Sequence, residues 1–294
     1  MTAPAHPTAA PFFRIGPERP ISPVVLSVPH AGRDYGPELL KATRLSREAL
    51  ETLEDRLVDR LVWRATAAGA TAFIARAPRA EIDLNRDPRE LDPALVAPPL
   101  PSGSLVQSAR SRGGLGLIPS RIAGAGPIWR ERIPRAELAR RIETIHTPYH
   151  AALEAALGHA LARFGEAILL DCHSMPPRPR GESDRHEVAT IVFGDRHGTT
   201  IGPGLLESAL AASRAQGYRT ACNAPYAGGH IVARHGRPRE GVHALQIEID
   251  RSTYLDADLR TPGPGFEGVS RLIAAVVQAL EVKVLQPPEA IAAE

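Results

Sequence analysis

The feature that most constrains the fold is an alternation of short apolar runs with longer segments of helical periodicity. Five six-residue runs, each bounded by glycine, proline or polar residues, have the pattern of buried strands: 23–28, 71–76, 166–171, 188–193 and 244–249. Strands that are apolar along their whole length are typical of a mostly parallel sheet covered on both faces. The alternation therefore predicts an α/β protein with a three-layer αβα architecture.

Helical spacing of apolar residues connects these runs. It predicts a helix over 46–68, with Ser46 as its N-cap and Gly69 after its end. The other predicted helices span 134–164, 204–216 and 265–282. Proline lacks the N–H that a helix interior needs, so the first of these three is expected to kink or restart at Pro148.

At 294 residues and 43% hydrophobic content, the chain can bury a large core without a disulfide or a metal to stabilise it. We predict a single domain over 1–294. The Pro-, Gly- and Ser-rich stretch 87–130 is too long for a plain connector and is predicted to be a loop excursion, or lid, over the substrate. Residues 1–20 and 286–294 are expected to be loose termini.

Composition excludes several classes of function. The net charge is +2 and the 35 basic residues are scattered, so no nucleic-acid surface is expected. No apolar run reaches the length of a membrane span, and the N-terminal residues do not resemble a signal peptide. With two cysteines, Cys172 and Cys222, no disulfide framework is possible, and the expected location is the cytoplasm.

Functional side chains follow the predicted strands. His30 comes after the run VVLSV, His173 after ILLD, and Asn85 and Arg86 after IDL. Ligands of open α/β sheets bind beyond the carboxyl ends of the strands, so these side chains are expected to serve one site. Two neutral imidazoles are suited to a divalent metal, and a catalytic zinc ion needs one more protein ligand, typically a carboxylate.

Three residues of the 46–68 segment are candidates for that carboxylate: Glu54, Asp55 and Asp59. On a helical wheel Glu54 falls within the apolar stripe and Asp55 at its border, so periodicity favours one of these two pointing inward. The alternative is a solvated charged face shared with neighbouring arginines.

Glu248 is the candidate general base. It lies on a strongly apolar strand, where an unpaired carboxylate would be costly unless it faces a polar cavity, a metal or an arginine. The alternative is a salt bridge to Arg251 or Arg86.

Asn85 and Arg86 are candidates for binding a substrate carboxylate. A guanidinium presents parallel donors to both oxygens of such a group, which makes arginine suited to this role. The alternative for Arg86 is an ion pair with Asp83 or Asp87.

Two further patterns carry less weight. His146 and His150 have the i, i+4 spacing of helical metal ligands, but Pro148 between them disturbs the helix. Cys172 precedes His173 on a strand, so the two side chains should point to opposite faces. A Cys–His nucleophilic pair is therefore not expected.

A series of motifs resembles a known family. In order over about 22–255, the chain contains LSVPHAG, EDRLVDRL, IDLNR, PYH, LLDCHSMP, APYAGGHI and GVHALQIEIDR. This combination resembles the N-formylglutamate amidohydrolases, whose α/β fold is similar to that of the zinc-dependent carboxypeptidases.

The resemblance implies roles for individual residues. His30 and His173 match the zinc histidines, and Glu248 matches the catalytic glutamate of the carboxypeptidase pattern. The pair Asn85 and Arg86 matches the pair that binds the substrate's carboxylate.

One position departs from the carboxypeptidase pattern, because Arg33 stands where that pattern has its zinc glutamate. Asp55, in the EDRLVDRL motif, is expected to replace it, with Asp59 as the reserve.

The function that the resemblance implies is hydrolysis of N-formyl-L-glutamate to formate and L-glutamate, a step of histidine breakdown, with one zinc ion. Arg178, Arg180 or Arg234 would complete recognition of the diacid. The alternatives are a related zinc amidohydrolase or carboxypeptidase-like enzyme on another N-acyl amino acid or small peptide, and a noncatalytic small-acid binding protein. The partner in each case is a small molecule; oligomeric state has no signal in the sequence.

Overall fold

The computed structural model describes residues 10–101, 103–178 and 188–286, and the chain divides into two units. The first consists of Met1–Arg14, Pro29–Glu54 and Phe73–Ala152; the second consists of Ile15–Val28, Asp55–Ala72 and Leu153–Glu294. Each unit is thus built from three separate stretches of sequence. The single domain over 1–294 remains a prediction.

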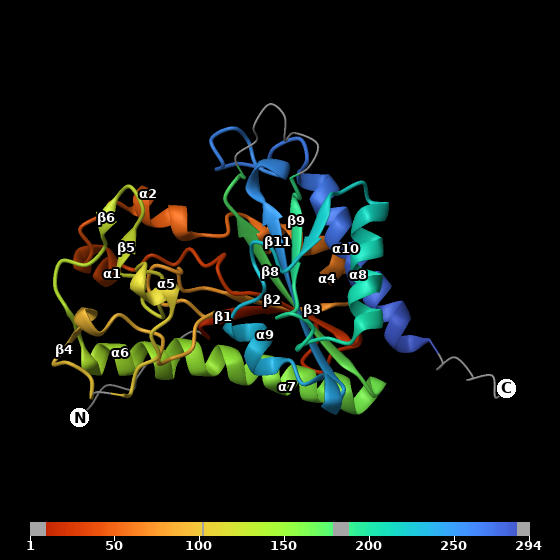
Figure 1. Cartoon of the computed structure of the whole chain (residues 1–294), viewed down its shortest axis with the longest axis horizontal. Coiled ribbons are helices and arrows are strands. Elements are labelled where there is room, and N and C mark those ends of the chain that lie inside the picture. Colours follow the sequence, from red (N-terminus) through yellow and green to blue (C-terminus); the bar gives the residue numbers. More distant parts are fainter. Residues whose placement is uncertain (1–9, 102, 179–187, 287–294) are drawn as a thin grey trace, which may run out of the picture. The chain divides into compact units, whose positions relative to one another are not determined.

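The central sheet has seven strands in the order β1-β3-β2-β8-β11-β9-β10 (Figure 1). Their bounds are β1 (Phe12–Ile15), β2 (Val24–Val28), β3 (Thr71–Ala75), β8 (Ala167–Met175), β9 (Ile191–Gly194), β10 (Thr220–Cys222) and β11 (Val242–Asp250). The pairs β2/β8, β8/β11 and β9/β10 are parallel, and β9/β11 is antiparallel. The predicted α/β fold with a mostly parallel sheet is confirmed, and β1 and β10 are additions to the predicted strands.

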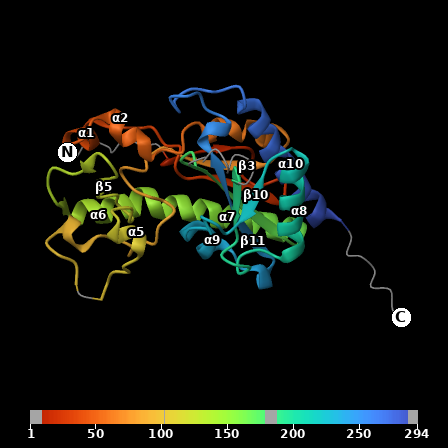
Figure 2. The ribbon, with the colours of Figure 1, turned by 45° about the horizontal axis from the view of Figure 1, so that its top comes forward.

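Helices of the second unit cover its strands. Their bounds are α3 (Val58–Leu61), α4 (Trp63–Ala67), α8 (Pro203–Ala215), α9 (His230–His235) and α10 (Phe266–Leu285). The long helix α10 packs against α8, α3 and α4, whereas α9 packs on β8 and β11. Figures 1 and 2 show α9 on one side of these strands and α8 with α10 on the other, as an αβα arrangement requires.

The strands β2, β8 and β11 are buried along their whole length. Successive residues of a strand point to opposite faces, so Cys172 and His173 of β8 project to different sides of the sheet. The Cys172 side chain is fully buried, and its Sγ lies 3.7 Å from the carbonyl oxygen of Leu170. Burial raises the pKa of this thiol, which leaves it unsuited to nucleophilic chemistry.

The helix predicted over 134–164 is present and contains a local π-turn. The chain runs through α6 (Arg135–Arg141), a π-helical turn (Ile142–His146) and α7 (Thr147–Phe164) without a break. Pro148 has no N–H to donate one turn back, and the wider π-turn just before it accommodates this loss.

The continuous helix predicted over 46–68 is wrong. Ser46 does cap a helix, accepting from the backbone N–H of Ala49, but α2 (Arg47–Leu50) is short and leads into a 3₁₀ turn (Glu51–Leu53). The chain is then extended at Glu54, and Leu57 has a φ of 60° before α3 begins. Where the helix is broken, the Asp55 side chain makes tertiary hydrogen bonds that are described below.

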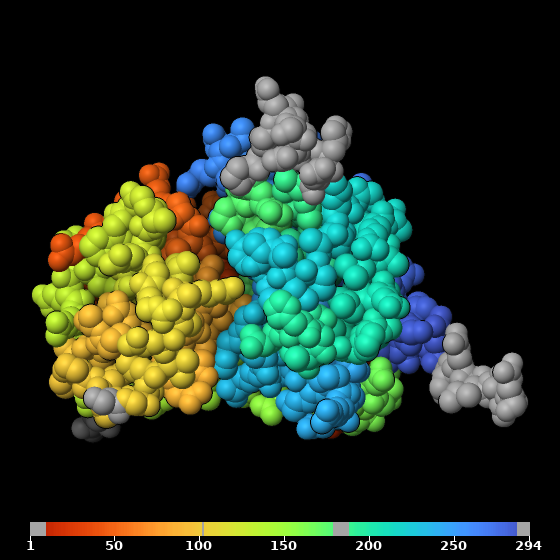
Figure 3. All heavy atoms as spheres, in the orientation of Figure 1, coloured from red at the N-terminus to blue at the C-terminus, as the bar shows by residue number. Residues whose placement is uncertain are grey.

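The stretch 87–130 is folded in the first unit. It contains a 3₁₀ turn (Pro93–Leu95), the two-residue strand β4 (Val96–Ala97) paired with β7 (Ile133–Pro134), α5 (Ala109–Arg112), and a hairpin of β5 (Arg121–Ile122) and β6 (Gly126–Pro127). Several of its apolar side chains are fully buried, among them Leu91, Leu117, Ile118 and Ile128. Figure 3 shows its orange to yellow atoms as one continuous surface. Its role as a lid remains a prediction.

Part of the predicted loose N-terminus is structured. In β1, the Phe12 ring packs edge-on against Phe73 and Tyr149, with centroids 5.5 and 6.0 Å apart. The helix α1 (Pro37–Ala42) follows later in the same unit. Residues 1–9 and 287–294, where the other loose ends were predicted, lie outside the described residues.

Among the helices that are described, none is long and apolar enough to cross a membrane.

Helix α10 offers a matched test of the core. Val276 is fully buried, whereas Val282 on the same helix is 48% exposed. We expect Val276→Ala to lower the free energy of unfolding by about 1–3 kcal/mol, because it removes two buried methyl groups and leaves a cavity. Val282→Ala should change it by less than about 0.5 kcal/mol. Equal losses in urea titrations would contradict the packing of α10.

Candidate active site

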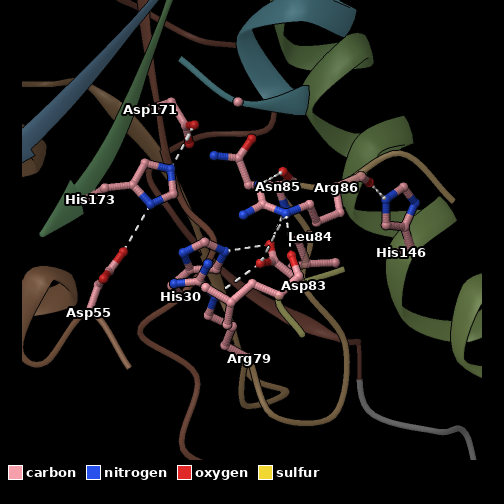
Figure 4. Close-up of polar contacts among 12 residues, drawn as sticks. His30, Asp55, Arg79, Asp83, Leu84, Asn85, Arg86, His146, Asp171 and His173 are labelled. Carbon is pink, nitrogen blue, oxygen red and sulfur yellow. Dashed lines mark hydrogen bonds and ion pairs between the residues drawn. The ribbon is translucent and has the colours of Figure 1, made fainter. Parts of the chain in front are cut away.

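His173, at the end of β8, lies between two carboxylates (Figure 4). Its Nε2 is 2.8 Å from Asp171 Oδ2, and its Nδ1 is 2.9 Å from Asp55 Oδ2. All three side chains are buried. Burial alone would lower the pKa of His173, but the two aspartates raise it well above its ordinary value. Each ring nitrogen of His173 therefore faces a carboxylate oxygen.

Other groups of the second unit hold the two aspartates in place. Ser27 of β2 donates to Asp171 Oδ1 over 2.8 Å. Ser174 Oγ and Arg251 Nη2 both donate to Asp55 Oδ1 over 3.2 Å, and Arg251 Nε also donates to Ser174 Oγ. Because these bonds occupy one oxygen of each carboxylate, the other oxygen of each is directed at His173.

His30, in the first unit, has a similar partner. It follows β2 by two residues, and its Nε2 lies 2.7 Å from Oδ1 of the buried Asp83. Arg79 donates to the other oxygen over 2.9 Å. Burial would raise the pKa of Asp83, but Arg79 and His30 lower it well below its ordinary value. The Asp83 carboxylate is therefore ionised, and its contact with Nε2 fixes the orientation of the His30 ring.

Glycine is required after His30. A Cβ on Gly32 would overlap the backbone carbonyl of Ala77, so no larger residue fits between these two segments. The neighbouring Asp34 N–H donates to the carbonyl of Arg76 over 3.0 Å. This close approach explains the glycine of the PHAG motif as a packing requirement of the His30 loop.

Asn85 and Arg86 are buried in the first unit. Arg86 donates from Nε to the carbonyl of Leu115 and from Nη1 to that of Asn85, each over 2.8 Å. Its Nε is also 3.9 Å from Asp83 Oδ2, so the alternative ion pair that the sequence suggests is present as a long contact. Asp87, the other alternative partner, pairs with Arg89. Burial lowers the pKa of Arg86.

His146 and His150 hold the backbone of this Asn85–Arg86 segment. His146 Nε2 is 3.0 Å from the carbonyl of Arg86, and His150 Nε2 is 2.9 Å from that of Leu84. The two buried rings lie 4.3 Å apart, one helical turn from each other. The i, i+4 spacing read from the sequence thus serves two backbone carbonyls of a segment without regular structure.

Glu248 lies beside His173 in the sheet. The parallel register of β8 and β11 pairs Glu248 with His173 and Gln246 with Asp171, so these four side chains share one face. Gln246 Nε2 donates to Glu248 Oε1 over 2.8 Å. Arg251, one alternative partner of Glu248, bonds Asp55 and Ser174.

The three carboxylates considered as the metal ligand have different surroundings. Asp55 meets His173, whereas the buried Glu54 accepts from the hydroxyl of Tyr35 over 2.8 Å. Burial and the Glu54 carboxylate together raise the pKa of Tyr35. Asp59 is half-buried in α3.

Of the additional arginines considered, Arg178 donates its backbone N–H to Asp250 Oδ2, and Arg234 lies exposed on α9. Arg180 lies outside the described residues.

Comparison with known proteins identifies the chain's relatives. A family model described as N-formylglutamate amidohydrolase matches residues 22–255. N-formylglutamate deformylase of Pseudomonas aeruginosa is 31% identical over 239 residues, which cover 80% of this chain and 82% of the relative. The deformylase of Pseudomonas putida is 30% identical over 240 residues, with the same coverage. The crystal structure of N-formylglutamate amidohydrolase from Ralstonia eutropha matches with a TM-score of 0.84 and 36% identity, covering 94% of this chain and 98% of that one.

The family match and these relatives define the class of protein as an enzyme that hydrolyses amides. The chain belongs to the N-formylglutamate amidohydrolase family. The resemblance that the motifs indicate over about 22–255 is confirmed.

The contact of His150 with Leu84 can be tested by removing its donor. We expect His150→Leu to lower the free energy of unfolding by about 1–3 kcal/mol, because it leaves a buried carbonyl without its hydrogen bond. The matched control is His159→Leu, an exposed histidine of the same helix, which should change it by less than about 0.5 kcal/mol. An unchanged stability of His150→Leu in urea titrations would show that this bond contributes nothing.

Proposed function

We propose that this enzyme hydrolyses N-formyl-L-glutamate to formate and L-glutamate, using one zinc ion bound by His30, Asp55 and His173. The names of its relatives support the substrate. The observation that carries the metal is the row Asp171–His173–Asp55, in which a buried imidazole has one nitrogen held by a carboxylate and the other facing a second carboxylate.

The residues fit a zinc ion. A histidine that binds zinc usually donates its other ring N–H to a carboxylate, which fixes the tautomer and the ring. Asp171 accepts such a bond from Nε2 of His173, so Nδ1 would be the ligand atom, and Asp55 Oδ2 is 2.9 Å from it. Asp83 stands in the same relation to Nε2 of His30. Nitrogen and carboxylate ligands without thiolate are typical of catalytic zinc.

A bound zinc ion would lower the pKa of a water to about 7 and so supply a hydroxide nucleophile at neutral pH. Glu248 would accept the proton of that water and deliver it to the leaving amine nitrogen. Its place beside His173 in the register of β8 and β11 supports this role. Asp171 would accept the Nε2 proton of His173 and so orient the ring, while His173 Nδ1 and the Asp55 carboxylate would hold the ion.

Asn85 and Arg86 are proposed to bind a carboxylate of the substrate. Arg86 is held by bonds to Leu115 and Asn85, so little side-chain entropy would be lost when a ligand binds to it. Arg178, Arg180 or Arg234 would complete the recognition of the second carboxylate. We further propose that the enzyme acts in the cytoplasm, in histidine breakdown.

The metal mechanism is tested by formate release from N-formyl-L-glutamate. We expect chelation to abolish activity and zinc to restore it, and we expect Glu248→Gln to reduce kcat by about 10²–10⁴-fold, the usual contribution of a general base. The exposed Glu267→Gln on α10 serves as the control and should keep full activity. Activity that survives both chelation and Glu248→Gln would contradict the mechanism.

The same assay with other N-acyl amino acids and small peptides tests the substrate. An enzyme that requires metal but ignores N-formyl-L-glutamate and cleaves another amide would keep the chemistry and exclude this substrate. Binding of small acids without turnover of any amide would instead favour a noncatalytic binding protein.

The carboxylate ligand is tested by metal analysis. We expect Asp55→Ala to lose bound zinc by at least about tenfold, whereas Asp59→Ala keeps it, because the Asp55 carboxylate lies 2.9 Å from His173 Nδ1. Elemental analysis of the purified variants measures the zinc-to-protein ratio. A full complement of zinc in Asp55→Ala would remove Asp55 from the ligand set.

A further inference from the structure

Gln246 is a buried amide on the same sheet face as the proposed catalytic groups. Its Nε2 donates to Glu248 Oε1 over 2.8 Å, and its Oε1 accepts from the backbone N–H of Gly229 over 2.8 Å. The residue is 3% exposed. It therefore links the carboxylate of Glu248 to the backbone that precedes α9.

The chemistry of the partners fixes the orientation of this amide. The Gly229 N–H can only donate, so the oxygen of Gln246 must face it. The NH₂ group is thereby directed at Glu248, where it meets an acceptor. A flipped amide would place its NH₂ against the Gly229 N–H and its oxygen against the carboxylate, which loses both bonds.

The Gly229 backbone is itself held by close packing. A Cβ on Gly194, at the end of β9, would lie 2.6 Å from the backbone N of Gly228. A Cβ on Gly228, whose φ is 107°, would lie 2.7 Å from a methyl group of Val232. The 227–229 backbone thus lies directly on the end of β9. This close packing fixes the direction of the Gly229 N–H that donates to Gln246.

We propose that Gln246 is a positioning residue for Glu248. Gly228 and Gly229 of the AGGH motif would in turn hold the backbone N–H that donates to Gln246. The proposal rests on the role of Glu248 as general base. The Gln246 amide holds one oxygen of the Glu248 carboxylate through a hydrogen bond over 2.8 Å, which limits rotation of that carboxylate. Proton transfer depends on a well-placed base, so a Glu248 free to rotate would act less often in a productive geometry.

The test measures kcat and KM of Gln246→Met, which has a similar volume and no donor, on whichever N-acyl amino acid the zinc enzyme turns over. We expect kcat to fall about 10–100-fold, the usual cost of losing such a supporting contact, with KM changed less than about threefold and zinc content unchanged. Gln246→Glu keeps the acceptor for Gly229 and loses the donor to Glu248, so kcat should fall at least as far. Ser270→Ala, which removes a buried hydrogen bond to Leu61 in the same unit, should lower stability and leave kcat unchanged.

A double-mutant cycle separates positioning from a general structural effect. In the Glu248→Gln background, Gln246→Met should lower the residual kcat by less than about twofold, because the group that it orients has lost its function. A loss as large as in the wild-type background would overturn the proposal, as would a wild-type kcat of Gln246→Met.

The same measurements show which hypothesis fails. Full activity of Glu248→Gln would overturn the role of Glu248 and, with it, that of Gln246. An inactive Glu248→Gln beside a fully active Gln246→Met would overturn the positioning role alone.

Discussion

The buried row of Asp171, His173 and Asp55 is the polar interaction around which the candidate site of the second unit is built. Two carboxylates without bulk water are costly unless charged or hydrogen-bonding partners satisfy them. Here the imidazole lies between them, while Ser27, Ser174 and Arg251 bind their outer oxygens. In the proposed zinc form His173 Nδ1 and the Asp55 carboxylate would hold the ion, while Asp171 would keep its bond to His173 Nε2.

This requirement also explains where the chain departs from its local preference. Helical periodicity continues from Ser46 to Ala68, yet the helix stops before Glu54 and resumes at Val58. A continuous helix would have kept Asp55 on its own surface, at the border of the apolar stripe. The extended backbone at Glu54 and the left-handed Leu57 instead accompany the bonds of Asp55 to His173, Ser174 and Arg251. The tertiary interactions of a buried charge outweigh a few helical hydrogen bonds.

The groups that support the candidate site carry weak signals in the sequence. Asp83, Asp171 and Gln246 each lie among apolar residues, and nothing in their spacing shows which side chain they contact. His146 and His150 do show helical spacing, but the same spacing suits metal ligands, core residues and donors to a backbone carbonyl. Such assignments depend on which segments, distant in the sequence, lie against each other.

By itself the sequence determined the α/β class, the principal strands, the long helices and the family, because these follow from periodicity and from ordered motifs. It also predicted a role for His173 from its place at the carboxyl end of a buried strand, where α/β proteins bind their ligands. The predictions for Asp55 and Glu248 came from the helical wheel, the apolar strand and the family motifs. Only the tertiary structure decided that Asp55 rather than Glu54 meets His173, that the 46–68 helix is broken, and that Gln246 bonds Glu248. The reason is physical: periodicity determines which face of an element is buried, whereas partners of buried polar groups depend on how separate elements pack.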